Sequence, residues 1–278
     1  MTSFASDARL RRTLTATPLA RRIERGTARE VDVSGFDRSR YPVGARRVAA
    51  IAQSSLAVGE WMAVDLFARL TQALTLAQAP IDLVSAAAKI PTDEVRHADI
   101  ALRMASALMP DDVEQPPVEP DRHAYLAAPM SIETLDVAML EMPAIGETLA
   151  CALLSASRDG ATDPVARAVF SALLRDEVNH ARLGWYYLAW RSEQWTTAER
   201  QRIADRAGNF VAHVEVMFGR GRDAPRGCQK AARALGVLDT PTQRAAIRAV
   251  MEQEVVPGLD GLGLGASHAW RVRKRLAS

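Results

Sequence analysis

Cysteine is scarce in this chain of 278 residues, which contains only Cys151 and Cys228. The two cysteines do not form a Cys-x-x-Cys spacing, which argues against a disulfide framework and against a zinc knuckle. This usage fits a reducing compartment, and we expect a cytoplasmic protein. The first residues agree, because Arg9, Arg11 and Arg12 interrupt any apolar run of the kind that a signal peptide needs.

Long apolar runs and a strong charge of one sign are also missing. Nowhere do about 18 apolar residues follow one another, so we expect no membrane span. The chain has 35 basic and 33 acidic residues and a formal net charge of +2. A nearly balanced charge gives no reason to expect nucleic acid or another polyanion as a partner.

The residues that are abundant favour helices. Alanine and leucine outnumber the β-branched residues, and apolar residues recur with a helical period in several segments. We expect an all-α protein with helices over 43–78, 82–108, 131–160, 164–190, 197–218 and 242–255. Asp82, Ser131 and Asp163 are the expected caps or openings of three of these helices, and Pro143 is expected to bend the helix that contains it.

Three regions follow from this pattern. Residues 1–43 form an N-terminal arm, residues 44–192 contain four long helices, and residues 193–278 contribute further helices that we expect to pack on the bundle. The only hint of extended structure in the arm is three apolar residues, Val31, Val33 and Phe36. A proline-rich loop over 110–120 separates the second helix from the third, as the long crossover of a ferritin-like four-helix bundle would.

A short motif occurs twice in the four-helix region. Asp93-Glu94-Val95-Arg96-His97 and Asp176-Glu177-Val178-Asn179-His180 each place a glutamate and a histidine three residues apart. On a helix, residues at this spacing project from neighbouring points of one face. Each motif is preceded by a lone glutamate in an apolar helical segment, Glu60 in the first case and Glu147 in the second. The spacing is typical of metal ligands.

The positions of the four glutamates along their helices support this interpretation. Glu147 and Glu177 lie at nearly equal distances from the turn between their helices. The distances of Glu60 and Glu94 from their own turn differ by only about 7 Å, at about 1.5 Å per residue. The glutamates would therefore meet near the middle of the bundle. Charged residues are seldom buried unless they are paired or bind a metal. A structural carboxylate network is the alternative, and we favour a dinuclear metal site. Carboxylates and imidazoles suit iron or manganese.

These residues carry a resemblance to a known family. The segment from about residue 45 to 192 resembles the ferritin-like superfamily, on the side of the di-iron carboxylate oxidases and oxygenases. The first motif is similar to the Asp-Glu-x-Arg-His signature of bacterial multicomponent monooxygenase large subunits. The resemblance implies two iron ions, with manganese or a mixed Mn/Fe pair as alternatives.

The resemblance also implies roles for individual residues. Glu94 and Glu177 would bridge the two metals, and Glu60 and Glu147 would be terminal ligands. His97 would complete the ligand set of one metal, and His180 would complete that of the other. Behind these ligands, Asp93 and Asp176 would hydrogen-bond to the histidine of the opposite motif and fix its orientation.

A site of this kind implies chemistry with dioxygen. We expect a non-haem di-iron enzyme that oxidises a small organic substrate by hydroxylation, N-oxygenation or desaturation. No flavin or nicotinamide motif is visible, so an external electron donor is the expected partner, and a homodimer is the expected assembly. Two alternatives remain, a ferroxidase or metal-handling protein without an organic substrate, and a Mn/Fe ligand-binding oxidase resembling the ribonucleotide reductase small subunit.

Two related groups differ from this sequence in specific features. Rubrerythrin-type peroxidases usually carry a Cys-x-x-Cys module, which is absent here. The arylamine N-oxygenases have comparable Glu and Asp-Glu-x-x-His spacings, and they carry a third histidine one turn before the second motif glutamate. This sequence has Leu173 at that position, and His213 is a conceivable substitute that we do not favour.

Other conspicuous residues are better explained by structure. We expect surface or structural roles for His123, His213, Glu215 and His268, and core packing for Trp185, Tyr186, Tyr187 and Trp190. Cys151 follows Glu147 by one turn and is expected to behave as a small apolar residue near the site. Small residues near the ligands leave room for a pocket or for close helix packing, namely Gly59, Ala63, Ala144, Gly146 and Gly184.

Overall fold

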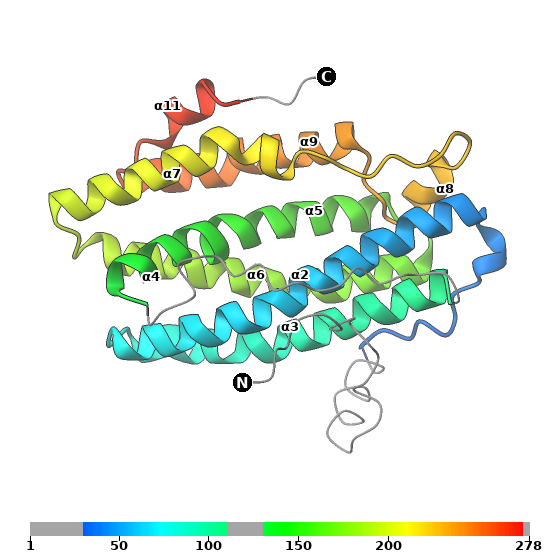
Figure 1. Cartoon of the computed structure of the whole chain (residues 1–278), viewed down its shortest axis with the longest axis horizontal. Coiled ribbons are helices and arrows are strands. Elements are labelled where there is room, and N and C mark those ends of the chain that lie inside the picture. The colour runs from blue at the N-terminus through cyan, green and yellow to red at the C-terminus, as the bar shows by residue number, and fades with distance from the viewer. Residues whose placement is uncertain (1–29, 111–129, 275–278) are drawn as a thin grey trace, which may run out of the picture.

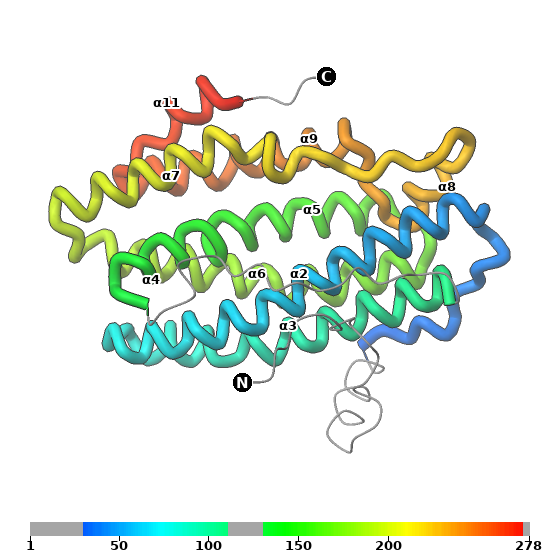
Figure 2. The backbone as a smooth tube through the Cα atoms, viewed as in Figure 1, coloured from blue at the N-terminus to red at the C-terminus, as the bar shows by residue number. Residues whose placement is uncertain are grey.

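The computed structural model describes residues 30–110 and 130–274, and within these ranges it contains helices and no strand. The all-α class is therefore confirmed for the described residues. Four long helical segments run back and forth along the long axis of the molecule (Figures 1 and 2). They are α2 (Val43–Leu76), α3 (Ile81–Leu108), the composite segment α4 (Ile132–Met139), η4 (Leu140–Gly146) and α5 (Glu147–Gly160), and α6 (Pro164–Ser192).

The first hairpin consists of α2 and α3, which pack along each other. The predicted cap at Asp82 is wrong, because α3 begins at Ile81 after Pro80, and the Asp82 carboxylate accepts a hydrogen bond from the Leu83 amide instead. Pro91 lies inside α3 without ending it. The α3 helix also contacts α6, so the two helices that carry the repeated motif are neighbours.

The third segment contains a change of helix type just before Glu147. Ser131 caps α4 by accepting a hydrogen bond from the Thr134 amide. Pro143 then lies in the π-helical segment η4, and the Glu147 amide donates to the carbonyl of Met142, five residues earlier. A π-helical segment contains one more residue in each hydrogen-bonded ring than an α-helix does. The segment η4 therefore affects the direction in which the Glu147 side chain projects from α5.

The apolar character of this segment reflects its place in the bundle. The run Ile132–Gly160 is the one helix, among the described residues, that is long and apolar enough to cross a membrane by length and composition, and half of its apolar window is buried inside the protein. The buried residues include Leu135, Met139 and Ile145, which belong to the largest hydrophobic cluster. Burial between other helices accounts for its composition.

The contact between η4 and α6 depends on a glycine. A Cβ atom built on Gly184 would lie 2.1 Å from the backbone nitrogen of Ala144, so only glycine allows this approach. Helix packing therefore accounts for Gly184. Gly59 differs, because a Cβ atom there would meet nothing within 4 Å.

The C-terminal helices form a second layer on the side of α4 and α5 (Figure 1). Helix α7 (Thr197–Phe218) has the predicted bounds, and Thr196 and Glu199 form a capping box at its start. The next long segment starts at Thr240 rather than 242 and continues beyond 255, through α9 (Thr240–Val250), η5 (Met251–Val255) and α10 (Val256–Gly261). Two short helices complete the layer, α8 (Gln229–Ala234) and α11 (Ala266–Arg271).

Residues 30–42, which we call the N-terminal strap, pack against the bundle without forming a strand. Val31 and Val33 are buried, and both join a hydrophobic cluster with residues of α2, α3 and α6. The strap includes a short 3-10 turn, η2 (Arg38–Arg40). The earlier part of the predicted arm and most of the predicted crossover over 110–120 lie outside the described residues. The ferritin-like arrangement of the bundle stays a prediction.

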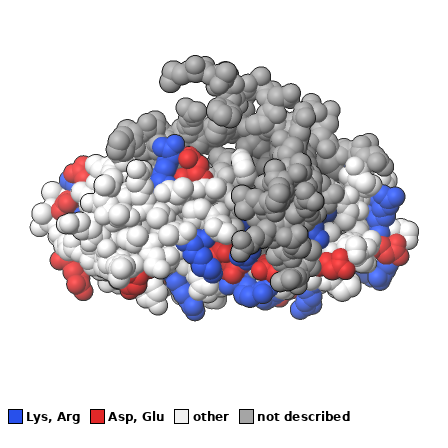
Figure 3. Space-filling model, turned by 90° about the horizontal axis from the view of Figure 1, so that it is seen from below, with Lys and Arg blue, Asp and Glu red and all other residues white. Residues whose placement is uncertain are grey.

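Charge is mixed on the surface. On the face drawn in Figure 3, the described Lys and Arg side chains are interspersed with Asp and Glu. This distribution agrees with the small net charge of the sequence.

Candidate metal site

Both motifs meet in the interior of the bundle. The carboxylates of Glu94 and Glu177 and the imidazoles of His97 and His180 each offer one ligand atom, and these four atoms all lie within 4.8 Å of one another. All four residues are buried. Glu94 and His97 come from α3 and Glu177 and His180 from α6, so the site exists only because the two helices are adjacent. This group can hold metal ions.

The distances show a two-fold pattern. The Nδ1 atom of His97 lies 2.8 Å from Oε1 of Glu177 and 3.4 Å from Oε2 of Glu94. The Nδ1 atom of His180 lies 3.1 Å from a carboxylate oxygen of each glutamate. Each glutamate therefore faces both imidazoles, with its two oxygens turned to different histidines.

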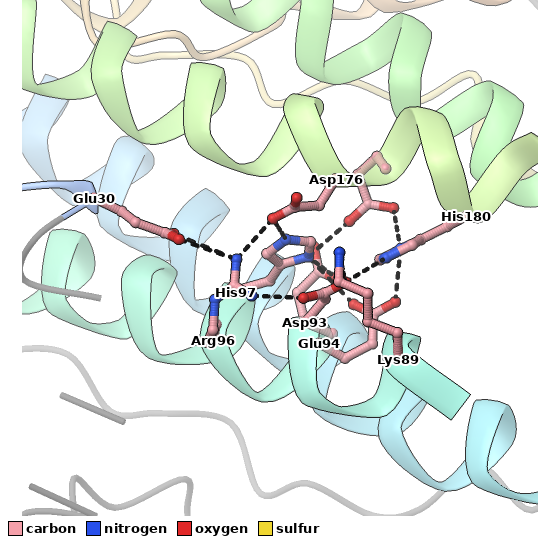
Figure 4. A network of polar contacts seen from close by, with 10 residues as sticks. Glu30, Lys89, Asp93, Glu94, Arg96, His97, Asp176 and His180 are labelled. Carbon is pink, nitrogen blue, oxygen red and sulfur yellow. Dashed lines mark hydrogen bonds and ion pairs between the residues drawn. The ribbon is translucent and has the colours of Figure 1, made fainter. Parts of the chain in front are cut away.

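The aspartates of the motifs lie on the outer side of the histidines (Figure 4). Oδ2 of Asp176 lies 3.4 Å from Nε2 of His97, and Oδ2 of Asp93 lies 3.6 Å from Nε2 of His180. Each aspartate thus faces the histidine of the opposite motif. As a consequence, both Nδ1 atoms point toward the glutamates and both Nε2 atoms point away from them.

Glu60 and Glu147 flank this core. Oε2 of Glu60 lies 4.0 Å from Nδ1 of His97, and its side chain is 11% exposed. Glu147 is half-buried and lies close enough to Glu177 for the charge of that carboxylate to raise its pKa. The structure therefore brings all six predicted residues to one place. That Glu60 and Glu147 ligate a metal stays a prediction.

The pKa values of the outer glutamates are raised. Burial is the largest cause for both Glu60 and Glu147, and the nearby charges of Glu177 and Glu94 raise the pKa further. The same environment reaches Cys151, where burial and then Glu177 and Glu147 raise the thiol pKa to about 12. The thiol is therefore protonated at neutral pH.

The inner residues form a network of opposite charges. Burial alone would raise the pKa of Glu94 and Glu177, but their close polar contacts with the imidazoles of His180 and His97 outweigh burial and lower both values. Burial likewise disfavours the charged imidazoles, yet their carboxylate partners raise the pKa of His97 well above its ordinary value and that of His180 to about 12. Without a metal, two imidazolium ions and two carboxylates therefore balance each other.

Several polar atoms of the site lack a hydrogen-bond partner. Both carboxylate oxygens of Glu94, Oε1 of Glu177 and Nδ1 of His97 are buried without a hydrogen bond of normal geometry. Buried polar atoms without partners are rare in folded proteins and need an explanation. These atoms are carboxylate oxygens and an imidazole nitrogen that converge on one point, which is a donor set that fits iron or manganese.

A cleft of about 630 Å³ reaches the outer side of the site between α3 and α6. Asp93 and His180 lie at its buried end, and Lys89, Arg182 and Tyr186 contribute exposed side chains to its lining. The cleft therefore connects the solvent to the side of the His180 imidazole that points away from the glutamates.

The other residues named from the sequence are accounted for by local contacts. Glu215 is buried and pairs with Arg248 and Arg273, and His213 contacts the carbonyl of Asn209. His268 is exposed. Tyr187 is buried, as expected for core packing, whereas Tyr186 is 65% exposed, so core packing is wrong for that residue. His123 lies outside the described residues.

Sequence reasoning missed a second buried charge. The Asp136 carboxylate accepts hydrogen bonds from Tyr187, Arg191 and Trp195. Sequence reasoning also missed Glu30, whose carboxylate reaches Arg96 of the first motif. Asp136 and Glu30 both lie outside the two motifs, so no local sequence signal could have identified their contacts.

Comparison with known proteins gives no family assignment. No protein-family model matches the chain, and no curated protein matches it.

Proposed function

We propose that this chain is a non-haem di-iron oxidoreductase of the ferritin-like kind, which uses dioxygen to oxidise a small organic substrate. The observation that carries the proposal is the meeting of two Glu-x-x-His pairs, with both glutamates facing both histidines and with buried carboxylate oxygens that lack a hydrogen bond of normal geometry. A purely structural network would be expected to satisfy these oxygens with well-aligned hydrogen bonds, whereas a metal site needs them as ligands.

The distances support this set of ligands. Glu94 and Glu177 each turn one oxygen to each imidazole, so both carboxylates would hold metal together with the two histidines. His97 with Glu60 and His180 with Glu147 would complete the two ligand sets. Bound iron would supply the redox chemistry and the binding of dioxygen, as metal cofactors do in such enzymes.

The protein's own contribution is to orient the ligands and to limit access by water. Asp93 and Asp176 contact the outer nitrogens of the imidazoles, which keeps Nδ1 directed toward the glutamates, where metal would bind. Glu94 and Glu177 are each at most 2% exposed, so the inner carboxylates are shielded from bulk solvent. Electrons come from an external donor in this proposal, and the assembly is a homodimer.

Metal loading provides the test. Apo protein is incubated anaerobically with Fe(II), excess metal is removed, and bound iron is counted, after which air is admitted and oxygen consumption is followed. We expect about two iron ions per chain, as for other dinuclear carboxylate sites, and oxygen consumption that depends on them. Glu94→Ala should bind one iron or none.

A matched control separates loss of the site from loss of a surface charge. Glu133→Gln removes an exposed glutamate that pairs with Arg202, away from the site, and it should bind iron as the wild type does. Wild-type protein that retains at most one iron contradicts the proposal. Uptake of hundreds of iron ions per chain would instead identify a storage protein.

A further inference from the structure

The guanidinium of Arg96 links both motifs to the N-terminal strap (Figure 4). Its NH1 atom donates to Asp93 at 2.5 Å, and its NH2 atom donates to Asp176 at 2.8 Å. The same NH2 atom lies 3.2 Å from a carboxylate oxygen of Glu30. One arginine thus contacts both aspartates and the start of the strap.

Both aspartates that Arg96 contacts stand directly before a candidate ligand in the sequence, Glu94 in one motif and Glu177 in the other. Asp93 faces the imidazole of His180, and Asp176 faces the imidazole of His97. Without the guanidinium, the negative charges of the two aspartates would repel each other across α3 and α6. Arg96 therefore holds both aspartates in the position in which each one orients a histidine.

Glu30 is held in place by the residues that follow it. Val31 and Val33 are buried in a hydrophobic cluster that includes residues of α3 and α6. At the other end of the strap, the Tyr41 hydroxyl donates to Asp163, the cap of α6, at 2.8 Å. The strap is thus anchored at both ends, and this anchoring positions the Glu30 carboxylate next to Arg96.

The ion pair between Glu30 and Arg96 is partly shielded from water. The side chain of Glu30 is 28% exposed and that of Arg96 is 22% exposed. A partly buried charge pair is weakened less by water than a surface pair is. Replacing Glu30 by a neutral residue would leave Arg96 with one fewer partner and free the start of the strap.

From these contacts we infer that Glu30 and Arg96 are positioning residues of the metal site, and that seating of the N-terminal strap and binding of metal favour each other. This inference rests on the proposed function, because it requires that the site binds metal. Linkage is reciprocal, so a strap that raises the metal affinity by a given factor is itself seated more firmly by the metal to the same extent.

Metal affinity is the first test. Apo protein is titrated with Mn(II) in competition with a fluorescent chelator, for wild type, Glu30→Gln, Glu30→Asp and the control Glu133→Gln. Loss of a group that orients a ligand typically weakens metal binding by about 10-fold to 100-fold. Because Glu30 acts one step further out, we expect Glu30→Gln to weaken Mn(II) binding by about 3-fold to 10-fold. Glu30→Asp should recover part of the loss, and the control should equal the wild type.

Hydrogen exchange of the strap is the second test. Amides of residues 31–41 should exchange more slowly in Mn(II)-loaded wild type than in apo protein, and Glu30→Gln should abolish this difference. Unchanged affinity in Glu30→Gln, or exchange that does not respond to metal in the wild type, overturns the inference. If the wild type binds two Mn(II) ions with either of these results, the proposed site survives and only the coupling to the strap fails. If the wild type binds no metal, both fail.

Discussion

Asp176 on α6 lies 3.4 Å from the outer nitrogen of His97 on α3, so each motif helps to orient the histidine of the other. The reciprocal contact joins Asp93 and His180 at 3.6 Å. Because the two helices share their supporting contacts as well as their ligands, a change in one motif is expected to disturb the metal environment of both.

Replacing Asp176 by asparagine tests this relationship. The amide has nearly the same shape but no charge, so it holds the His97 imidazole less firmly and provides a weaker partner for Arg96. We expect Mn(II) affinity to fall by about 10-fold to 100-fold, with an unchanged circular dichroism spectrum. Asp159→Asn, at an exposed carboxylate that pairs with Arg158, is the control. Equal affinities in the two variants would contradict the supporting role of Asp176.

The protonation state of the site predicts how metal binding depends on pH. Without metal, the raised pKa values of His97 and His180 favour charged imidazoles near neutrality, and the raised pKa values of Glu60 and Glu147 favour their protonated forms at a higher pH than is usual for glutamate. Metal ions compete with these protons. Binding of two divalent ions should therefore release protons, about two of them from the imidazoles and the rest from whichever outer glutamates are protonated. Titration calorimetry in buffers of different ionisation enthalpy measures this number, and affinity should rise with pH.

The same pKa values predict the stability of the apo protein. The pKa of His180 is raised from 6.5 to about 12, so its stabilising contribution is complete below pH 6.5 and is lost as the pH rises through 12. Glu60 and Glu147 are also raised, and their contributions likewise fall with rising pH. The lowered pKa of Glu94 acts in the opposite sense, and its contribution is lost as the pH falls through that value.

Melting curves test these signs. The apo protein should lose stability from about pH 6.5 upward, while the Mn(II)-loaded protein should not, because the metals replace the protons. The difference between the two melting temperatures should therefore widen as the pH rises. A constant difference would show that the site does not exchange protons for metal.

The core of the candidate site could be predicted from the sequence because its information is local. A glutamate and a histidine three residues apart share a face of any helix, and the apolar neighbours of Glu94 and Glu177 indicated which face is buried. The all-α class followed from composition and period in the same way. The contacts of Arg96 with Asp176 and Glu30 depend on how distant segments meet, and no spacing along the chain encodes them.

The helix details show the same limit. The sequence predicts a bend at Pro143, and the structure places this residue in a π-helical segment that packs closely against α6 at Gly184. Pro91 also interrupts the backbone hydrogen bonds of a helix, and α3 nonetheless continues through it. Tertiary packing outweighs the local cost of proline in both places.

Gly184→Ala tests the close contact between α6 and η4. The new Cβ atom would lie 2.1 Å from the Ala144 nitrogen, so the helices must separate. Overpacking of this kind typically costs about 1–3 kcal/mol, and occasionally more. Gly59→Ala is the matched control, because its Cβ meets nothing and alanine should stabilise the helix by about 0.5–1 kcal/mol. Urea denaturation of both variants gives the comparison, and a Gly184→Ala variant as stable as the wild type would contradict the contact.

Asp136→Asn tests the second buried charge. The carboxylate receives Arg191 through two hydrogen bonds, at 2.9 Å each, and also accepts from Tyr187 and Trp195. Asparagine keeps one acceptor oxygen but places an amide donor against these donors, and it leaves the Arg191 charge with only the more distant Glu199 carboxylate, 3.9 Å away, as a counterion. Breaking a buried ion pair in this way typically costs about 3–5 kcal/mol.

Urea denaturation followed by tryptophan fluorescence measures this loss, because Trp195 is itself a donor to Asp136. Glu133→Gln, on the same helix, is the control, since its exposed ion pair with Arg202 should contribute less than about 1 kcal/mol. Asp136 joins α4 to α6 through Tyr187 and Arg191, neither of which belongs to the candidate site. We therefore expect Asp136→Asn to retain Mn(II) binding under conditions in which it is folded, whereas a loss of both stability and metal binding would show that this buried charge also supports the site.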